Sequence, residues 1–276
     1  MPMALSFSAS LKARVVQEFS NLLIFRPLGY LVARLFYPTP VSPPALVLLH
    51  TLLGLALAYL IARYPELDWV SALLLQFKTV LDNADGQLAR LRNQADELGR
   101  YLDTEADLLV NVALFGALAL RTGEPWLSLA GFAVFTLVQS WDFNAEYLYR
   151  AARGEPFRPP VRDPDSPLLR LLRGIYAVFY APQDRLVRGL ERALFGWLTR
   201  GLSEERKQLL APQWWNLWSV AAVVNCGLSS QFLFMGLFLA FRQPGSYLTF
   251  VLLQGAYLGL VYLWRILRFL IIRSRP

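Results

Sequence analysis

The stretch DNADGQLARLRNQADELGRYLDTEAD, residues 82–107, carries Asp82, Asp85, Asp103 and Asp107 inside or beside segments that are otherwise apolar enough to enter a membrane. Ionisable side chains are costly at such depth, so they are functional candidates by default. In a helix, Asp82 and Asp85 lie three residues apart and therefore share one face. Asp103 and Asp107, four residues apart, share a face of the next helix in the same way. Two facing helices would bring the four carboxylates together.

A cluster of four carboxylates suits a hard divalent cation. Mg²⁺ and Mn²⁺ prefer oxygen ligands, and without a cation the negative charges would repel one another. Small residues extend the same two helical faces, with Gly86 and Ala89 beside the first pair and Gly99 four residues before Asp103. Small side chains at these positions let a bulky ligand approach the backbone, and they also permit close packing of helices.

Eight positions of this stretch follow the spacing DxxDGxxAR…GxxxDxxxD, with eight residues between the arginine and the second glycine. They are Asp82, Asp85, Gly86, Ala89, Arg90, Gly99, Asp103 and Asp107. The complete pattern resembles the signature of the CDP-alcohol phosphotransferase (CDP-alcohol phosphatidyltransferase) family. The resemblance covers 26 residues directly, and the rest of the chain is similar to the family only in its apparent plan of helices. A generic DxxD pair would instead indicate surface carboxylates bridged to Arg90, Arg92 and Arg100.

The resemblance implies an enzyme that releases CMP from a CDP-alcohol. The hydroxyl of a second alcohol would attack the β-phosphorus and receive the alcohol-linked phosphoryl group. By position, Asp82, Asp85 and Asp103 match the family's ligands for Mg²⁺ or Mn²⁺. Asp107 matches the base that accepts the hydroxyl proton, and it lies close enough in sequence to Asp103 to ligate the metal as well. The positions implied to bind the CDP-alcohol are Gly86, Ala89, Arg90 and Gly99.

Two substrate classes stay open within this resemblance. Either the donor is CDP-diacylglycerol and the acceptor a small polar alcohol, or the donor is a CDP-headgroup of the choline or ethanolamine type and the acceptor is diacylglycerol. Four arginines that follow the fourth apolar run suit an acidic acceptor and favour CDP-diacylglycerol, although the positive-inside rule alone also predicts them. They are Arg150, Arg153, Arg158 and Arg162.

Further polar side chains are candidates for contact with the substrates. Lys78 lies four residues before Asp82, hence on the same helical face but deeper in the membrane. It either pairs with Asp82 as a structural salt bridge or holds a substrate phosphate at the floor of the pocket. Gln139, Asp142 and Glu146 share roughly one face of the fourth apolar run, where they either line the acceptor site or simply leave the membrane.

The composition indicates a polytopic membrane protein, because 55% of the 276 residues are hydrophobic and the mean hydropathy is +0.38. The net charge of +7 is typical of cytoplasmic Lys and Arg near anionic headgroups, and no nucleic-acid motif accompanies it, so we expect a lipid bilayer and no nucleic acid as partner. A single cysteine, Cys226, and a single histidine, His50, exclude a disulfide framework and a Cys/His zinc site. We expect His50 to be packed or capping rather than catalytic.

Apolar runs of about twenty residues predict membrane-spanning helices. Six are expected, at 43–63, 67–91, 96–121, 125–149, 213–241 and 245–270. The predicted fold class is therefore an all-α integral membrane protein with six transmembrane helices. Its membrane domain covers 43–276 and follows an N-terminal region over 1–42.

Two interfacial amphipathic helices are predicted on the cytoplasmic side. The first covers 4–25 and is interrupted at Pro27. The second lies near 186–197, within a cytoplasmic segment over 150–211 that begins with a Pro-rich linker. The apolar run at 175–181 is too short to span a membrane and is expected to dip into the interface or to pack on the bundle.

The distribution of Lys and Arg predicts the orientation. The regions before the first span, between the second and third, over 150–211 and after the sixth hold most of these residues, and the opposite side holds only Arg63, Arg121 and Arg242. Both termini and the carboxylate cluster are therefore expected on the cytoplasmic side, in the cell membrane. A homodimer is expected from the family resemblance alone.

A cation-coupled membrane transporter is an alternative of a different class, because aspartates within the membrane also serve such proteins. The sequence contains no evident inverted repeat, and a transporter leaves the spacing of Gly86, Ala89, Arg90 and Gly99 without a reason. Formation of CMP that depends on Mg²⁺ or Mn²⁺ separates the two classes.

Overall fold

Several helix boundaries follow from side chains that satisfy the backbone at helix ends. Ser42, Asp96 and Ser166 each accept a hydrogen bond from the backbone N–H three residues later, and a proline directly follows both serines. Gly123 ends a helix in the left-handed conformation, with φ of 71°. These local signals set where the central helices of the fold begin and end.

A computed structural model describes residues 6–157 and 163–274 of the chain. The described residues form helices and loops, and none of them forms a β-strand. The elements in chain order are α1 (Phe7–Ser10), the π-helix η1 (Asn21–Phe25), α2 (Arg26–Phe36), α3 (Pro43–Arg63), the 3₁₀-helix η2 (Pro65–Leu67), α4 (Asp68–Leu91), α5 (Glu97–Thr122), α6 (Pro125–Ala151), α7 (Pro167–Leu198), α8 (Glu204–Trp214), α9 (Leu217–Val224), α10 (Leu228–Ala240) and α11 (Pro244–Arg273).

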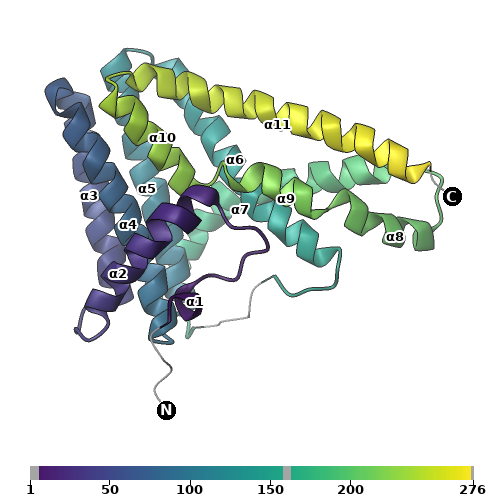
Figure 1. The fold of residues 1–276 in the computed structure, drawn as a ribbon, viewed down its shortest axis with the longest axis horizontal. Coiled ribbons are helices and arrows are strands. Elements are labelled where there is room, and N and C mark those ends of the chain that lie inside the picture. Colours follow the sequence, from purple (N-terminus) through teal and green to yellow (C-terminus); the bar gives the residue numbers. More distant parts are fainter. Residues whose placement is uncertain (1–5, 158–162, 275–276) are drawn as a thin grey trace.

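The helices α3, α4 and α5 pack side by side as a bundle, and α2 and α10 pack against α4 (Figure 1). On the other side, α6 packs against α5 and is covered by α7, α9 and α11. α11 extends well beyond the bundle, and α8 and α9 lie along it (Figure 1). Fully buried apolar side chains, including Leu57, Leu114, Phe135 and Phe232, fill the space between these helices.

A close approach between α3 and α5 occurs at Gly54. A Cβ atom at this position would lie 2.6 Å from Cγ1 of Val110, so a larger residue would push the two helices apart. His50 lies one turn earlier on the same face of α3. The close approach therefore brings His50 toward the helices that carry the four aspartates.

The all-α class predicted from the sequence is confirmed. Five of the six predicted spans are observed as single helices, α3, α4, α5, α6 and α11, with ends within three residues of the predicted ones. Within the described chain, three helical segments are long and apolar enough to cross a membrane by length and composition, namely Pro43–Arg63, Glu204–Ala240 and Pro244–Arg273. α4 and α5 have comparable lengths but carry the charged side chains of the candidate site. The count of six spans therefore stays a prediction.

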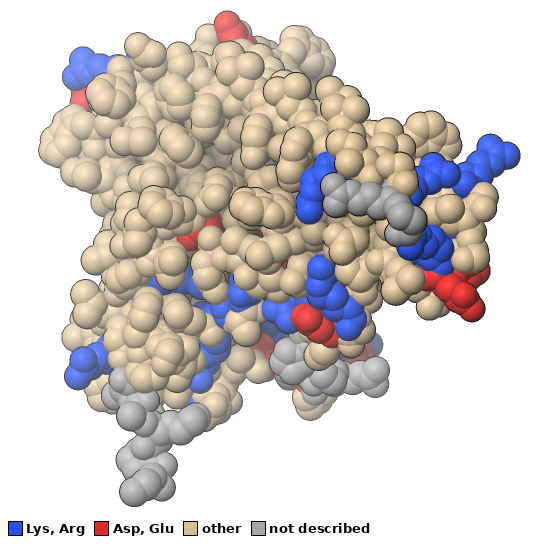
Figure 2. All heavy atoms as spheres, turned by 45° about the vertical axis from the view of Figure 1, so that its right-hand side comes forward, with Lys and Arg blue, Asp and Glu red and all other residues tan. Residues whose placement is uncertain are grey.

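The outer surface of the helices is largely apolar. Leu52 on α3 and Leu260 on α11 are each 65% exposed, and Leu120 on α5 is 74% exposed. Figure 2 shows a broad surface with few charged side chains above a zone in which Lys and Arg gather. A water-soluble protein rarely exposes so large an apolar surface, whereas lipid contact explains it. The apolar helices thus indicate an integral membrane protein.

The N-terminal region does not form the helix predicted over 4–25. α1 ends at Ser10 and is followed by eight irregular residues. Arg14 in this stretch turns inward to carboxylates on α6, and Glu18 turns inward to the start of α10, so both charged side chains pack against the helix bundle. Pro27 does not interrupt a helix either, because it lies in the first turn of α2.

The predicted fifth span over 213–241 is not a single helix, because turns separate α8, α9 and α10, although the stretch Glu204–Ala240 is apolar enough to cross a membrane. Oε1 of Glu18 accepts a hydrogen bond of 2.6 Å from the backbone N–H of Ser230, in the first turn of α10. A Cβ atom at Gly227 would lie 2.8 Å from the same carboxylate. The break between α9 and α10 thus places a carboxylate at a helix N-terminus, where a negative charge is stabilised.

The second interfacial helix, predicted near 186–197, belongs to a longer one. α7 includes both that range and the apolar run at 175–181 in one helix of 32 residues. It packs against α5 and α6. The run at 175–181 is therefore a part of α7 that packs on the bundle, which is one of the two placements expected for it.

Candidate active site

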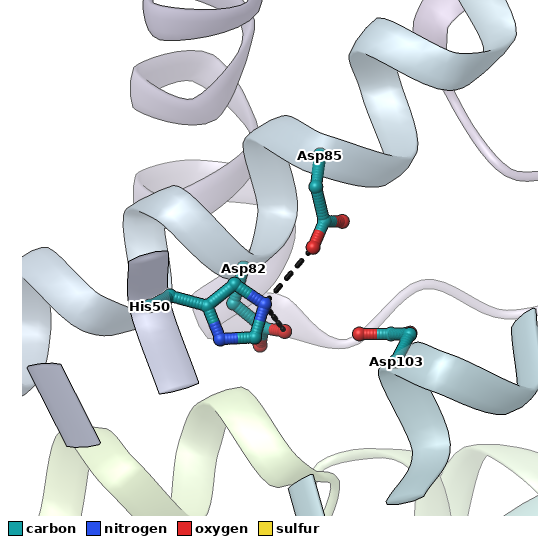
Figure 3. Close-up of side chains that lie close together, drawn as sticks. All are labelled: His50, Asp82, Asp85 and Asp103. Carbon is teal, nitrogen blue, oxygen red and sulfur yellow. Dashed lines mark hydrogen bonds and ion pairs between the residues drawn. The ribbon is translucent and has the colours of Figure 1, made fainter. Parts of the chain in front are cut away.

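The two pairs of aspartates lie on facing helices, as their spacing predicts. Asp82 and Asp85 point from α4, and Asp103 points from α5, into a common space that His50 enters from α3 (Figure 3). Each of these four side chains offers one ligand atom, and these atoms all lie within 4.8 Å of one another. A set of atoms this close together can surround a single ion.

Negative charge is in surplus in this group. Four aspartate carboxylates, including Asp107 one turn along α5 from Asp103, are accompanied by one ammonium, that of Lys78. Oδ1 of Asp103 is buried and finds no hydrogen-bond partner among the described residues. Burying an unpaired carboxylate oxygen is costly, and a cation would supply the missing partner. The oxygen donors and their charge fit Mg²⁺ or Mn²⁺.

Lys78 forms its shortest ion pair across the helices rather than along its own helix. Its Nζ atom lies 2.8 Å from Oδ1 of Asp107 and 3.8 Å from Oδ2 of Asp82. The side chain is fully buried, and the ammonium lies 4.9 Å from the ring centroid of Phe232. A pairing with Asp82 was one of the two roles that the sequence left open for Lys78, and the shorter ion pair with Asp107 was not expected. Lys78 thus stabilises the charged form of the aspartate to which the signature assigns proton transfer.

His50 is a site residue that the sequence reasoning missed. It is fully buried, as a packed residue would be, but its Nε2 atom lies 3.0 Å from Oδ2 of Asp85 and 3.6 Å from Oδ1 of Asp82. The signal was present in the sequence, because His50 is the only Asp, Glu, His, Lys or Arg between the ends of the apolar span 43–63. A polar residue in such a place is a functional candidate.

The small residues of the signature have specific neighbours. A Cβ atom at Gly86 would lie 3.3 Å from the guanidinium of Arg90, which donates a hydrogen bond to the backbone carbonyl of Ser10. A Cβ atom at Gly99 would lie 2.8 Å from Oδ1 of Asp96, the residue that caps α5. Ala89 is half-buried in the last turns of α4. Gly86 therefore leaves room for the arginine, and Gly99 permits the cap.

A cavity of about 460 Å³ adjoins the aspartates on the side of α6 and α7. Its wall includes Asp103, Asp107 and Gln139. The rest of the wall is mainly polar and aromatic, and it includes Arg100, Asn111, Phe143, Tyr176, Tyr180 and Asp184. A small polar molecule in this cavity would reach the carboxylate of Asp107.

The sequence reasoning also missed the contribution of α7 to this cavity. Asp184 accepts hydrogen bonds from Ser140 and Asn144 on α6, each of 2.7 Å, and from the hydroxyl of Tyr176 at 2.6 Å. The tyrosine comes from the apolar run that was too short for a span. The available signal was a tyrosine in an apolar run. A buried tyrosine hydroxyl needs a hydrogen-bond partner, so its presence indicates a polar group nearby.

Asp142 and Glu146, two predicted acceptor contacts, are occupied by ion pairs. Arg14 from the N-terminal region lies 2.9 Å from Asp142 and 3.0 Å from Glu146. Burial lowers the pKa of Arg14, but the two carboxylates raise it by more, so its pKa lies above the ordinary value. Neither carboxylate lines the cavity, whereas Gln139 does. Contact of Asp142 and Glu146 with an acceptor stays a prediction.

The arginines expected to gather an acidic acceptor are also engaged elsewhere. Arg150 pairs with a carboxylate on its own helix at 3.0 Å, and Arg153 donates to the backbone carbonyl of Trp215 at 2.8 Å. Neither lines the cavity. Arg158 and Arg162 lie outside the described residues, so the role predicted for all four arginines remains a prediction.

Comparison with known proteins agrees with the signature. Residues 41–158 match the model of the CDP-alcohol phosphatidyltransferase family, and this range contains α3 to α6 and all eight signature positions. The resemblance to this family is therefore confirmed over residues 41–158.

One relative is the "Bifunctional IPC transferase and DIPP synthase" of Aquifex aeolicus (strain VF5), which is 33% identical over 85 residues. The aligned part is 31% of this chain and 19% of that protein. The chain thus spans about a fifth of the length of the curated relative it matches.

Proposed function

We propose that this protein is an integral membrane enzyme of phospholipid biosynthesis. It transfers a substituted phosphate from a CDP-alcohol to the hydroxyl of a second alcohol and releases CMP. The observation that carries the proposal is the meeting of the four signature aspartates beside a cavity whose wall includes Asp103 and Asp107. Their surplus of negative charge suits a divalent cation, and a diphosphate needs such a counter-charge during phosphoryl transfer.

Three aspartates, Asp82, Asp85 and Asp103, would hold Mg²⁺ or Mn²⁺, and Asp107 is close enough to share in this. A bound ion supplies charge neutralisation at the diphosphate and stabilises the leaving phosphate. At the end of α4, Arg90 adds a second positive charge for the diphosphate. Gly86, Ala89 and Gly99 keep the approach to the backbone open for the cytidine part of the donor.

Asp107 has the position for proton transfer. It lines the cavity in which the acceptor would bind, and Lys78 holds one of its carboxylate oxygens at 2.8 Å. As the acceptor oxygen forms its bond to the β-phosphorus, the bond from phosphorus to the CMP oxygen breaks, and the hydroxyl proton passes to the Asp107 carboxylate.

The cavity supports CDP-diacylglycerol as the donor. Its size and its polar groups, such as Arg100, Asp184 and Tyr176, suit a small polar alcohol as the acceptor. The transfer of a CDP-headgroup of the choline or ethanolamine type to diacylglycerol is the alternative within the same reaction class.

The setting of the enzyme is part of the proposal. α3 to α6, the segment containing α9 and α10, and α11 would cross the cell membrane, with both termini and the aspartates toward the cytoplasm. The zone of Lys and Arg visible in Figure 2 supports a single cytoplasmic face. A homodimer is proposed from the family resemblance alone.

The experiment that tests this function measures CMP release by the purified protein in liposomes with Mg²⁺ or Mn²⁺. CDP-diacylglycerol, CDP-choline and CDP-ethanolamine are offered as donors against a panel of alcohols. Asp107→Asn should abolish the release. Glu105→Gln is the matched control, because it removes a buried carboxylate from the same helix that is not among the clustered side chains. A protein that binds cytidine nucleotides but transports a cation without forming CMP would contradict the proposal.

A further inference from the structure

His50 occupies a position that packing alone does not explain. It is the single histidine of the chain, and its side chain is fully buried on α3. Its Nε2 atom faces Asp85 and Asp82, and together with Asp103 they form the close group of potential ligand atoms (Figure 3). The imidazole thus enters the proposed metal site from a third helix, one that carries none of the signature residues.

The distances around His50 match those between ligands of one ion. An octahedral ion with bonds of about 2.1 Å has neighbouring ligand atoms about 3.0 Å apart and opposite ones about 4.2 Å apart. Nε2 of His50 lies 3.0 Å from Asp85 and 3.6 Å from Asp82, and the whole group stays within 4.8 Å. The four donor atoms need little movement to bind the same ion.

Two buried atoms of this group find no hydrogen-bond partner within the described part of the chain, Oδ1 of Asp103 and Nδ1 of His50. Without an ion, the nearest acceptor for a ring proton is Oδ2 of Asp85, 3.0 Å from Nε2. A cation held between the two groups would displace this proton, and the ring proton would then lie on Nδ1. Nε2 can then offer its lone pair to a cation, as the commonest imidazole ligands do. A role limited to holding Asp85 by a hydrogen bond would leave the approach to Asp82 and Asp103 unexplained.

We infer that His50 is a nitrogen ligand of this metal site and that it biases the site toward a transition-metal ion such as Mn²⁺ over Mg²⁺. The inference rests on the proposed function, since it concerns the same ion. Mg²⁺ is bound almost entirely through oxygen and keeps several waters, whereas imidazole is a common ligand of transition metals. Replacing one water or carboxylate by an imidazole therefore favours the transition metal.

Because the chain has one histidine, isotope labelling tests the inference without any mutation. Tag-free protein in nanodiscs is loaded with Mn²⁺ in the presence of CMP, once with natural and once with ¹⁵N-labelled histidine. Pulsed electron paramagnetic resonance should show a nitrogen coupling to Mn²⁺ that changes from ¹⁴N to ¹⁵N. Bound Mn²⁺ without such a coupling would overturn the inference and leave the four-aspartate site intact.

Competition between the two ions gives a second readout. His50→Gln should reduce the ratio of Mn²⁺ to Mg²⁺ affinity by about tenfold or more. Even the mutation of a residue that only hydrogen-bonds to a metal ligand changes metal affinity by about 10- to 100-fold. The control is Thr51→Val, because this buried neighbour hydrogen-bonds only to the backbone of α3. An unchanged ratio in His50→Gln would count against the inference. No Mn²⁺ binding by the wild-type protein would instead refute both the inference and the proposed metal site.

Discussion

Replacing Lys78 with Met removes the one ammonium that accompanies the four aspartates and keeps a side chain of similar length. Lys78 lies 2.8 Å from Asp107 and 3.8 Å from Asp82. At an effective dielectric constant of about 20, two unit charges at 4 Å attract by about 4 kcal/mol, and part of this is offset by desolvation. Removing one partner of a buried pair costs about 3–5 kcal/mol. For a chain of this size, the thermal unfolding midpoint should fall by on the order of 10 °C without divalent ions.

Thermal unfolding of the detergent-purified protein, followed by tryptophan fluorescence with and without Mn²⁺, measures this effect. Mn²⁺ should stabilise Lys78→Met more than the wild type, because a bound cation replaces part of the lost positive charge. Thr79→Val is the matched control, since its hydroxyl bonds only within α4, and it should cost about 1 kcal/mol. If Lys78→Met unfolds at the wild-type midpoint without divalent ions, the carboxylates do not depend on this ammonium.

Three further outcomes are expected. Arg14→Met should lower the free energy of unfolding by about 3 kcal/mol in chemical denaturation, because Asp142 loses its partner. A wild-type value would show that this ion pair contributes no stability. Gly54→Val should cost about 1–3 kcal/mol or more, because its Cβ would clash with Val110, whereas Gly116→Ala, with open space at its Cβ, should unfold near the wild-type midpoint. Chelation of divalent ions by EDTA should both stop CMP release and lower the unfolding midpoint, and Mn²⁺ should restore both, so activity that persists after chelation would contradict a metal-dependent reaction.

The parts of the fold that the sequence predicts well are those decided locally. The start of α3 follows from Ser42 and the prolines after it, and the start of α5 from Asp96, so their boundaries needed no tertiary information. The regular spacing of the aspartates likewise places each pair on one helical face. These features depend on residues within one turn of each other.

The parts that the sequence did not predict depend on partners far along the chain. The irregular stretch around Arg14 exists because carboxylates on α6 pair with this arginine, and the break before α10 accommodates Glu18. A periodicity analysis shows neither partner. In the site, the ion pair between Lys78 and Asp107 and the approach of His50 both cross between helices, so only the packing of α3, α4 and α5 reveals them.

The most direct test of the proposed transfer compares two products in one reaction by ³¹P nuclear magnetic resonance. Wild-type protein in liposomes with CDP-diacylglycerol, Mn²⁺ and the preferred alcohol should form CMP and a new phosphodiester lipid in equal amounts. Glu105→Gln should do the same, and Asp107→Asn should form neither. CMP without the phosphodiester would show hydrolysis instead of transfer, and an Asp107→Asn variant as active as the wild type would contradict the role assigned to the four aspartates.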